Sequence, residues 1–236
     1  MNRHQRIVRI IVVCMCCACI IACVIVGRIT ANSFVDNTDY NMYTEKENYE
    51  VYFCEMDYAE DEEFGFIEDD NIESLKDLQK EDVIVVKVKL KKGAKRCLYY
   101  ESVLSYIEIL DVYSGNLKKG DIIGFFEPLD CRETQMDATD GYAPMQEEGT
   151  YILFLQQLKN TFFGDDDYVY RLANLTYGKY NYDDKIPRLF EEEQLEPGYD
   201  KSLQYEELHN ADVLLYDKES YEKYCKLKTA VWEEYK

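Results

Sequence analysis

Histidine is almost absent from this 236-residue sequence. The two that occur are His4 and His209, so a Ser-His-Asp triad or a His-Glu-x-x-His metal site has almost nothing to be built from. The sequence also lacks a Gly-x-Ser-x-Gly motif and a Gly-rich phosphate loop. We therefore predict no catalytic residue, no resident metal and no cofactor, and we interpret His209, in a polar stretch, as a surface residue.

Positive charge is scarce as well. Lysine and arginine number 27 against 47 aspartates and glutamates, which gives a formal net charge of −20 at pH 7. Such a surplus repels a phosphate backbone, and the densest basic run is only Lys87 to Arg96, so we expect no nucleic-acid partner. Cations or basic partners are favoured instead. The hydrophobic share of 47% is enough for a packed core and argues against disorder.

Charged residues are missing from Ile10 to Gly27, with Arg28 directly after. At about 1.5 Å per residue this run and its flanks reach the roughly 30 Å of a bilayer core. Three arginines precede the run: Arg3, Arg6 and Arg9. The positive-inside rule then predicts a single-pass protein of the cell membrane, with a cytoplasmic N-terminus and an extracytoplasmic C-terminal domain. The membrane would thus be contacted through the N-terminal helix.

Three processing outcomes are open for this segment. The run is long and lacks an Ala-x-Ala site, which favours an uncleaved signal anchor. Ile20 to Cys23 resembles a lipobox, which would place a lipid on Cys23. Cleavage at Ala31 is the third reading. The expected organisation is a cytoplasmic tip and transmembrane helix in residues 1–28, a polar tether in 29–48 and an exported domain in 49–236.

Cysteine occurs nine times, and five of these residues lie in the apolar run, where thiols act as small hydrophobes. The other four are Cys54, Cys97, Cys131 and Cys225. In an oxidising compartment they permit two disulfides, with three connectivities that the sequence does not choose between. Free buried thiols are the alternative.

Apolar periodicity predicts a mainly β domain with helices, of the α+β class. In the stretch from Asp82 to Lys92, Ile84, Val86 and Val88 alternate with lysines, as in a half-buried strand. The other predicted strands are 97–113, 120–127, 149–155 and 168–172, with a further short one at 49–54. The 97–113 run is long for one strand, so we expect it to be bent or broken by a bulge. Short connections predict a closed five-stranded antiparallel barrel.

Two helices are expected. Ser74 to Gln79 begins with a hydroxyl cap and has an acid at Asp77. The second, amphipathic helix covers about residues 218–235, with Asp217 as its cap and an apolar face that we expect to pack on the barrel. Lys228 lies inside that face and is expected to reach solvent along its aliphatic stem.

The order of four segments carries a family resemblance. They are Ser74-Leu75-Lys76-Asp77-Leu78, Asp82-Val83-Ile84-Val85-Val86, Asp111 through Ile123, and Glu148-Gly149-Thr150-Tyr151-Ile152-Leu153-Phe154-Leu155. Over roughly residues 72–180 this order resembles an exported OB-like barrel domain of Gram-positive membrane-anchored proteins and lipoproteins. That domain is similar in shape to the inhibitory domain of tissue inhibitors of metalloproteinases (TIMPs).

The resemblance implies a fold but no catalytic residues. Protease inhibition is not implied, because the animal inhibitors act through an N-terminal cysteine and this chain begins with an apolar segment. The family's Gly-rich ending is replaced here by Leu172 through Tyr180.

Two compositional excesses suggest binding. Carboxylates crowd the stretch from Asp57 to Asp70 and a turn with the calcium candidates Asp165, Asp166 and Asp167; hydrated acidic surface is the simpler interpretation. The 22 tyrosines could stack on a ligand, although most lie in predicted strands and suit them. We predict a binding or interaction module for an exported protein or peptide. The alternative is a cell-wall hydrolase that uses paired carboxylates.

Overall fold

The computed structural model describes residues 12–13, 15–26, 38–55, 67–99, 101–158, 169–182, 186–197 and 202–235. The chain divides into two units, Met1–Asp36 and Asn37–Lys236. In the first unit the described residues are helical. Among all the described residues, however, no helix is long and apolar enough to cross a membrane. A single-pass helix needs about 20 mostly apolar residues. The predicted N-terminal transmembrane helix, and the cell-membrane localisation that rests on it, are therefore wrong.

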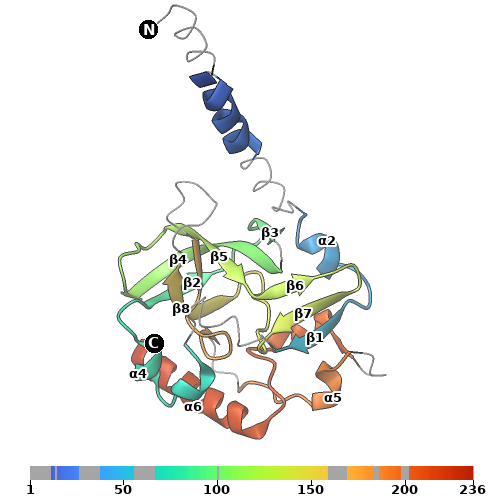
Figure 1. Cartoon of the computed structure of the whole chain (residues 1–236). Coiled ribbons are helices and arrows are strands. Elements are labelled where there is room, and N and C mark those ends of the chain that lie inside the picture. Colours follow the sequence, from blue (N-terminus) through green and yellow to red (C-terminus); the bar gives the residue numbers. More distant parts are fainter. Residues whose placement is uncertain are drawn as a thin grey trace, which may run out of the picture. The chain divides into compact units, whose positions relative to one another are not determined.

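Five strands of the second unit close into a barrel (Figure 1). They are β2 (Ile84–Lys89), β4 (Ser102–Ser114), β5 (Ile122–Glu127), β8 (Thr150–Gln157) and β9 (Val169–Leu172). Going around the ring, β2 pairs with β4, β4 with β5, β5 with β9, β9 with β8 and β8 with β2. This closed order confirms the predicted barrel and is compatible with an OB-like fold.

One pairing differs from the predicted antiparallel pattern. β5 and β9 run parallel, with Gly124 opposite Val169 and Phe125 opposite Tyr170. A closed ring with an odd number of strands cannot alternate direction throughout, so at least one neighbouring pair has to be parallel. Closure of five strands therefore requires this exception.

The long apolar run at 97–113 is divided between two strands. β3 (Arg96–Tyr99) turns back and pairs antiparallel with the start of β4. Along its other edge, β4 shifts register against β2 between Val85 and Val86 and again between Lys87 and Val88. These irregularities raise the local twist and let the strand bend around the barrel. The expected bulging of this run is thus present, but the run forms two strands and not the single strand that was predicted.

A second sheet lies beside the barrel (Figure 1). Its order is β11 (Leu203–Gln204), β1 (Glu50–Cys54), β7 (Gln135–Thr139) and β6 (Leu129–Cys131), with β1 and β7 parallel. The sequence pattern predicted no strand where β6 and β7 lie. Buried Val51, Met136 and Leu203 belong to the same apolar cluster as the barrel interior, so the two sheets share one core.

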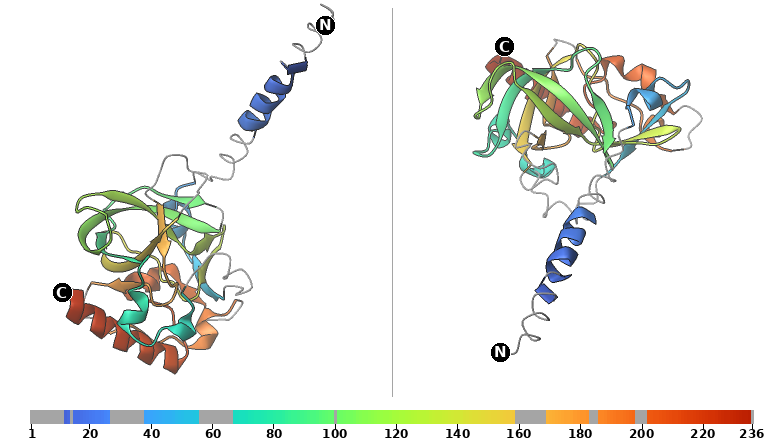
Figure 2. Two further views of the ribbon diagram at one scale, coloured as in Figure 1. Left: turned by 60° about the vertical axis from the view of Figure 1, so that its left-hand side comes forward. Right: turned by 90° about the horizontal axis from the view of Figure 1, so that it is seen from above.

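Helix α6 (Lys218–Tyr235) covers the outer face of β2, β8 and β10 (Lys179–Asn181) (Figures 1 and 2). Tyr224, Leu227 and Val231 of the helix form one buried cluster with Val85 and Phe154 of the strands. The remaining helices are short: α2 (Asn41–Thr44), η1 (Asp69–Asn71), α4 (Leu75–Leu78), α5 (Glu192–Leu195) and η2 (Tyr205–Asn210).

The predicted caps are present at α4 and α6. At α4, the Ser74 backbone N–H donates to Asp77 Oδ2 at 2.8 Å. At α6, the Ser220 backbone N–H donates to Asp217 Oδ1 at 2.8 Å. Each carboxylate satisfies an N–H that has no partner within its helix.

Candidate ligand-binding face of the barrel

The outer face of β4 and β5 has exposed apolar side chains. In the register of the two strands, Tyr106 lies opposite Gly124 and Glu108 lies opposite Ile122. Ile122 is 63% exposed and Tyr106 is 36% exposed. Because Gly124 has no side chain, no side chain of β5 lies directly opposite the Tyr106 ring. This face therefore presents an aromatic ring and an aliphatic side chain to solvent.

Two hollows flank Ile122. The first, of about 250 Å³, lies between the turn after β2 and the strands, and its lining consists of Lys91, Lys92, Gly93, Ala94, Lys95, Tyr106, Glu108 and Ile122. The second, of about 500 Å³, lies at the turn from β4 to β5, and its lining consists of Asn116, Leu117, Lys118, Asp121, Ile122, Gln157 and Tyr170. Since Ile122 lines both, the two hollows are parts of one surface, which we call the open face.

Lysines surround the open face although the chain as a whole is acidic. Lys91 forms an ion pair with Glu108 at 2.9 Å, and the Lys95 ammonium lies 5.7 Å from the centroid of the Tyr106 ring. Within the described part of the chain, Lys92, Lys95 and Lys118 have no carboxylate within 4.0 Å. Three positive charges are thus available to a ligand.

The turn between β2 and β3, which carries Lys92 and Lys95, is held by hydrogen bonds to Glu147 and Glu148. Glu148 pairs with Lys89 at 2.6 Å and accepts a hydrogen bond from the Lys92 backbone N–H at 2.8 Å. Glu147 accepts one from the Gly93 N–H at 2.9 Å, and Gly93 has the left-handed φ of +68° that glycine adopts without strain. These contacts fix the backbone and leave the Lys92 and Lys95 side chains exposed.

Behind the open face, a buried polar cluster locks the strands together. Arg96 of β3 pairs with Glu127 of β5 at 2.6 Å and donates to Ser105 of β4 at 3.0 Å. Glu127 also accepts hydrogen bonds from the Tyr142 hydroxyl at 3.0 Å and the Met145 N–H at 2.9 Å. Burial alone would lower the pKa of Arg96, but the Glu127 carboxylate beside it more than compensates and raises it. Arg96 therefore keeps its positive charge, and its hydrogen bonds tie β3, β4 and β5 together.

The open face combines exposed apolar side chains with positive charge. Its carboxylates are Glu108, which is neutralised by Lys91, and Asp121, which accepts a hydrogen bond from the Lys118 backbone N–H at 2.9 Å. A rigid sheet with exposed Tyr106 and Ile122 offers apolar contact, and the lysines offer charge. Such a surface can hold an anionic segment that also carries apolar side chains.

The four cysteines that could form disulfides differ in solvent exposure. Cys54 is exposed, Cys97 and Cys131 are buried, Cys225 is half-buried, and each is a free thiol. Cys97 and Cys131 belong to different apolar clusters, and burial raises the pKa of the Cys131 thiol to about 12. Cys23 is an exposed free thiol in the first unit. Disulfide pairing and lipidation at Cys23 stay predictions.

The calcium candidates Asp165, Asp166 and Asp167 lie outside the described residues. In the part of the chain that is described, no group of three His, Cys, Asp or Glu side chains comes together as a metal site. The side chain of His209 is also outside what the structure describes.

The sequence did not single out the open face. Tyr106 was interpreted as an ordinary strand residue, and Lys87 to Arg96 only as the densest basic run. The available signal was the short distance in sequence between this basic run and Tyr106. The pairing that places Ile122 opposite Glu108 depends on strand register, which the sequence order does not reveal.

Comparison with known proteins adds no relative: no family model matches the chain, and neither does any curated protein.

Proposed function

We propose that this chain is a binding module whose open face takes an acidic segment of a partner protein. The observation that carries the proposal is the set of unpaired lysines, Lys92, Lys95 and Lys118, around exposed Tyr106 and Ile122 in a chain of net charge −20. The net charge alone favours basic partners, but a ligand in contact responds to the nearest charges, because screening weakens those beyond about 10 Å.

The strand order supports the place of the site. In OB-fold barrels the face of the second and third strands and the adjoining loops bind ligands. Here β4 and β5 occupy those positions in the ring. We also propose, on this strand order, that the barrel belongs to the OB-like class that includes the TIMP-like domains. An extended acidic peptide fits this surface better than nucleic acid, because exposed Ile122 offers contact to an aliphatic side chain, which a nucleic acid lacks.

A hydrolase has no comparable support. Glycoside hydrolysis needs a carboxylic acid that stays protonated, which enzymes achieve by burying it, and a second carboxylate facing the same cleft. Each hollow of the open face has one carboxylate, Glu108 or Asp121. A third hollow, at the second sheet, is lined by two carboxylates, Glu47 and Glu206, but both are exposed to solvent.

The test is calorimetric titration of the full chain with a short peptide of alternating Glu and Leu. We expect the double variant Lys92→Gln/Lys95→Gln to bind about tenfold more weakly, a loss of about 1.4 kcal/mol. The matched control is Lys80→Gln/Lys218→Gln, which removes the same charge from exposed positions elsewhere.

Equal weakening in both double variants would contradict the proposal, since it would show an effect of net charge alone. So would equally tight binding of a peptide with Gln in place of Glu.

A further inference from the structure

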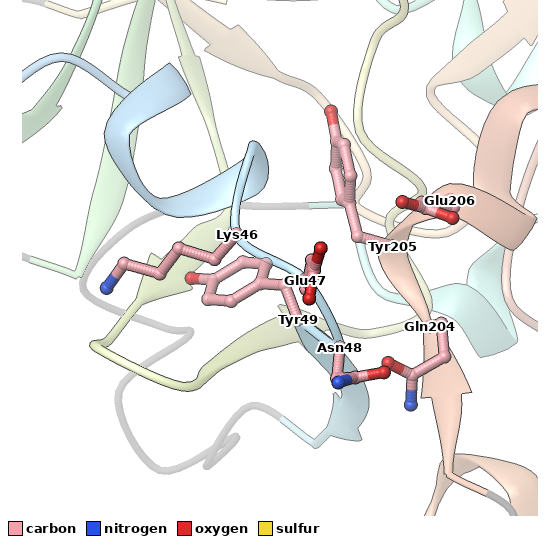
Figure 3. A pocket seen from close by; sticks show the side chains of 7 residues that line it. All are labelled: Lys46, Glu47, Asn48, Tyr49, Gln204, Tyr205 and Glu206. Atoms are coloured by element: carbon pink, nitrogen blue, oxygen red, sulfur yellow. The ribbon is translucent and has the colours of Figure 1, made fainter.

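A third hollow, of about 220 Å³, lies at the second sheet (Figure 3). It is bordered by the connection from α2 to β1 and by the start of η2. The lining consists of Lys46, Glu47, Asn48, Tyr49, Gln204, Tyr205 and Glu206. The two bordering segments are joined by the pairing of β1 with β11 and by a hydrogen bond from the Tyr205 N–H to the Tyr49 carbonyl at 2.8 Å. We call this hollow the tyrosine pocket.

Two rigid aromatic rings form part of its wall. The rings of Tyr49 and Tyr205 meet edge to face, with centroids 6.4 Å apart. The Tyr49 hydroxyl lies 2.8 Å from the carbonyl oxygen of Gln135, and the Tyr40 hydroxyl donates to that of Tyr205 at 3.0 Å. Because both hydroxyls are held, the rings keep fixed positions. Aromatic faces of this kind attract cations.

The polar groups of the pocket are mainly acceptors. Gln204 donates through Nε2 to the Ser202 carbonyl at 3.2 Å, while its Oε1 is buried and accepts no hydrogen bond from the described residues. Glu47 and Glu206 are exposed at the pocket and have no cation within 4.0 Å among the described side chains. The partner that these two carboxylates lack is a hydrogen-bond donor with positive charge.

Lys46 does not supply that charge. Its Nζ donates to the Glu133 carbonyl at 2.7 Å and lies 4.6 Å from the centroid of the Tyr43 ring. Figure 3 shows its ammonium directed away from Glu47 and Glu206. The two carboxylates thus remain uncompensated on the pocket side.

We propose that the tyrosine pocket binds a primary ammonium group, such as the end of a lysine side chain of a partner protein. The ammonium would donate to the carboxylates of Glu47 and Glu206 while it lies against the Tyr205 ring. A volume of about 220 Å³ is below the roughly 300–1,000 Å³ of pockets for drug-sized ligands, so it suits a single side chain. This site stands apart from the open face, whose charge preference is opposite.

The probe is butylammonium chloride, which reproduces the end of a lysine side chain, and the readout is two-dimensional NMR of the full chain. We expect it to shift the amide signals of Asn48, Tyr205 and Glu206, whereas butanol and butyrate do not. The variant Glu47→Gln/Glu206→Gln keeps the shape of the pocket and should bind butylammonium at least tenfold more weakly. Glu233→Gln/Glu234→Gln, on the exposed side of α6, is the control that loses the same charge.

Three outcomes would overturn the proposal: shifts spread over the acidic surface without a maximum at the pocket, equal affinity for butanol, or equal weakening in both double variants. Because the open face is tested with a separate, acidic peptide, either site can fail without the other.

Discussion

The barrel has two outer faces that are built from similar strands but end in different environments. On β2, β8 and β10, Val85 and Phe154 lie under α6 and are at most 1% exposed. On β4 and β5, Tyr106 and Ile122 are 36% and 63% exposed. Outward-facing apolar residues of the barrel are thus buried under α6 on the covered face. On the open face they remain exposed to solvent.

The two faces also treat lysine differently. On the covered side, Lys228 of α6 is 6% exposed and pairs with Asp212 at 2.5 Å. Beside this pair, Lys179 donates to the Asp212 carbonyl at 2.8 Å. On the open face, Lys92, Lys95 and Lys118 are exposed. Lysine therefore stabilises the fold on one face and supplies free charge on the other.

The largest expected effect comes from breaking the buried pair. Lys228→Met leaves the Asp212 carboxylate buried without its ammonium partner, which should lower the free energy of unfolding by about 3–5 kcal/mol. Lys226→Met, on the exposed side of the same helix, should change it by less than about 0.5 kcal/mol. Urea unfolding followed by circular dichroism measures both. Similar losses in the two variants would show that Asp212 does not depend on Lys228.

The covered and open faces can next be compared by removing one apolar side chain from each. Leu227→Ala leaves a cavity under α6 and should cost about 2–4 kcal/mol. Ile122→Ala removes a side chain that is already mostly in water and should cost less than about 0.5 kcal/mol. If Ile122→Ala proved as costly in urea unfolding, the open face would be part of the core.

A smaller effect is expected from pH on the covered side. Burial lowers the pKa of Lys179 from 10.5 to about 8. Between these two values the unfolded chain holds a proton that the folded chain has lost, so stability should rise with pH across this window. The gain from pH 8 to pH 10 is about 2 kcal/mol at roughly 1.4 kcal/mol per pKa unit.

Above pH 10 the gain should reverse, because burial raises the pKa of tyrosines such as Tyr142 and Tyr180, and their ionisation favours unfolding. Chemical unfolding at pH 8, 9 and 10 tests the window, with Lys179→Met as the control. A rise that persists in Lys179→Met would assign it to another group.

The sequence predicted those strands and helices that depend on interactions between residues close together in the chain. The alternation of Ile84, Val86 and Val88 indicated β2, and the acids at Asp77 and Asp217 indicated the starts of α4 and α6, as the structure shows. The transmembrane prediction failed because a charge-free run was equated with a spanning helix, and no described helix is long and apolar enough for that.

Features that depend on distant partners were not predictable. The parallel pairing of β5 with β9 follows from ring closure, and β6 and β7 are short strands that form only against β1 and each other. Lys228 was expected to reach solvent, but Asp212, distant in sequence, holds it in the interior. The open face depends in the same way on the register that places Ile122 beside Glu108.

The most direct test of the open face is NMR mapping of the full chain with the acidic Glu and Leu peptide. We expect the largest amide shifts on Lys92 to Lys95, Tyr106, Ile122 and Gly124, and we expect these shifts to diminish as the salt concentration is raised. The largest shifts on α6, or no shifts at all, would contradict the claim that β4 and β5 form the binding surface.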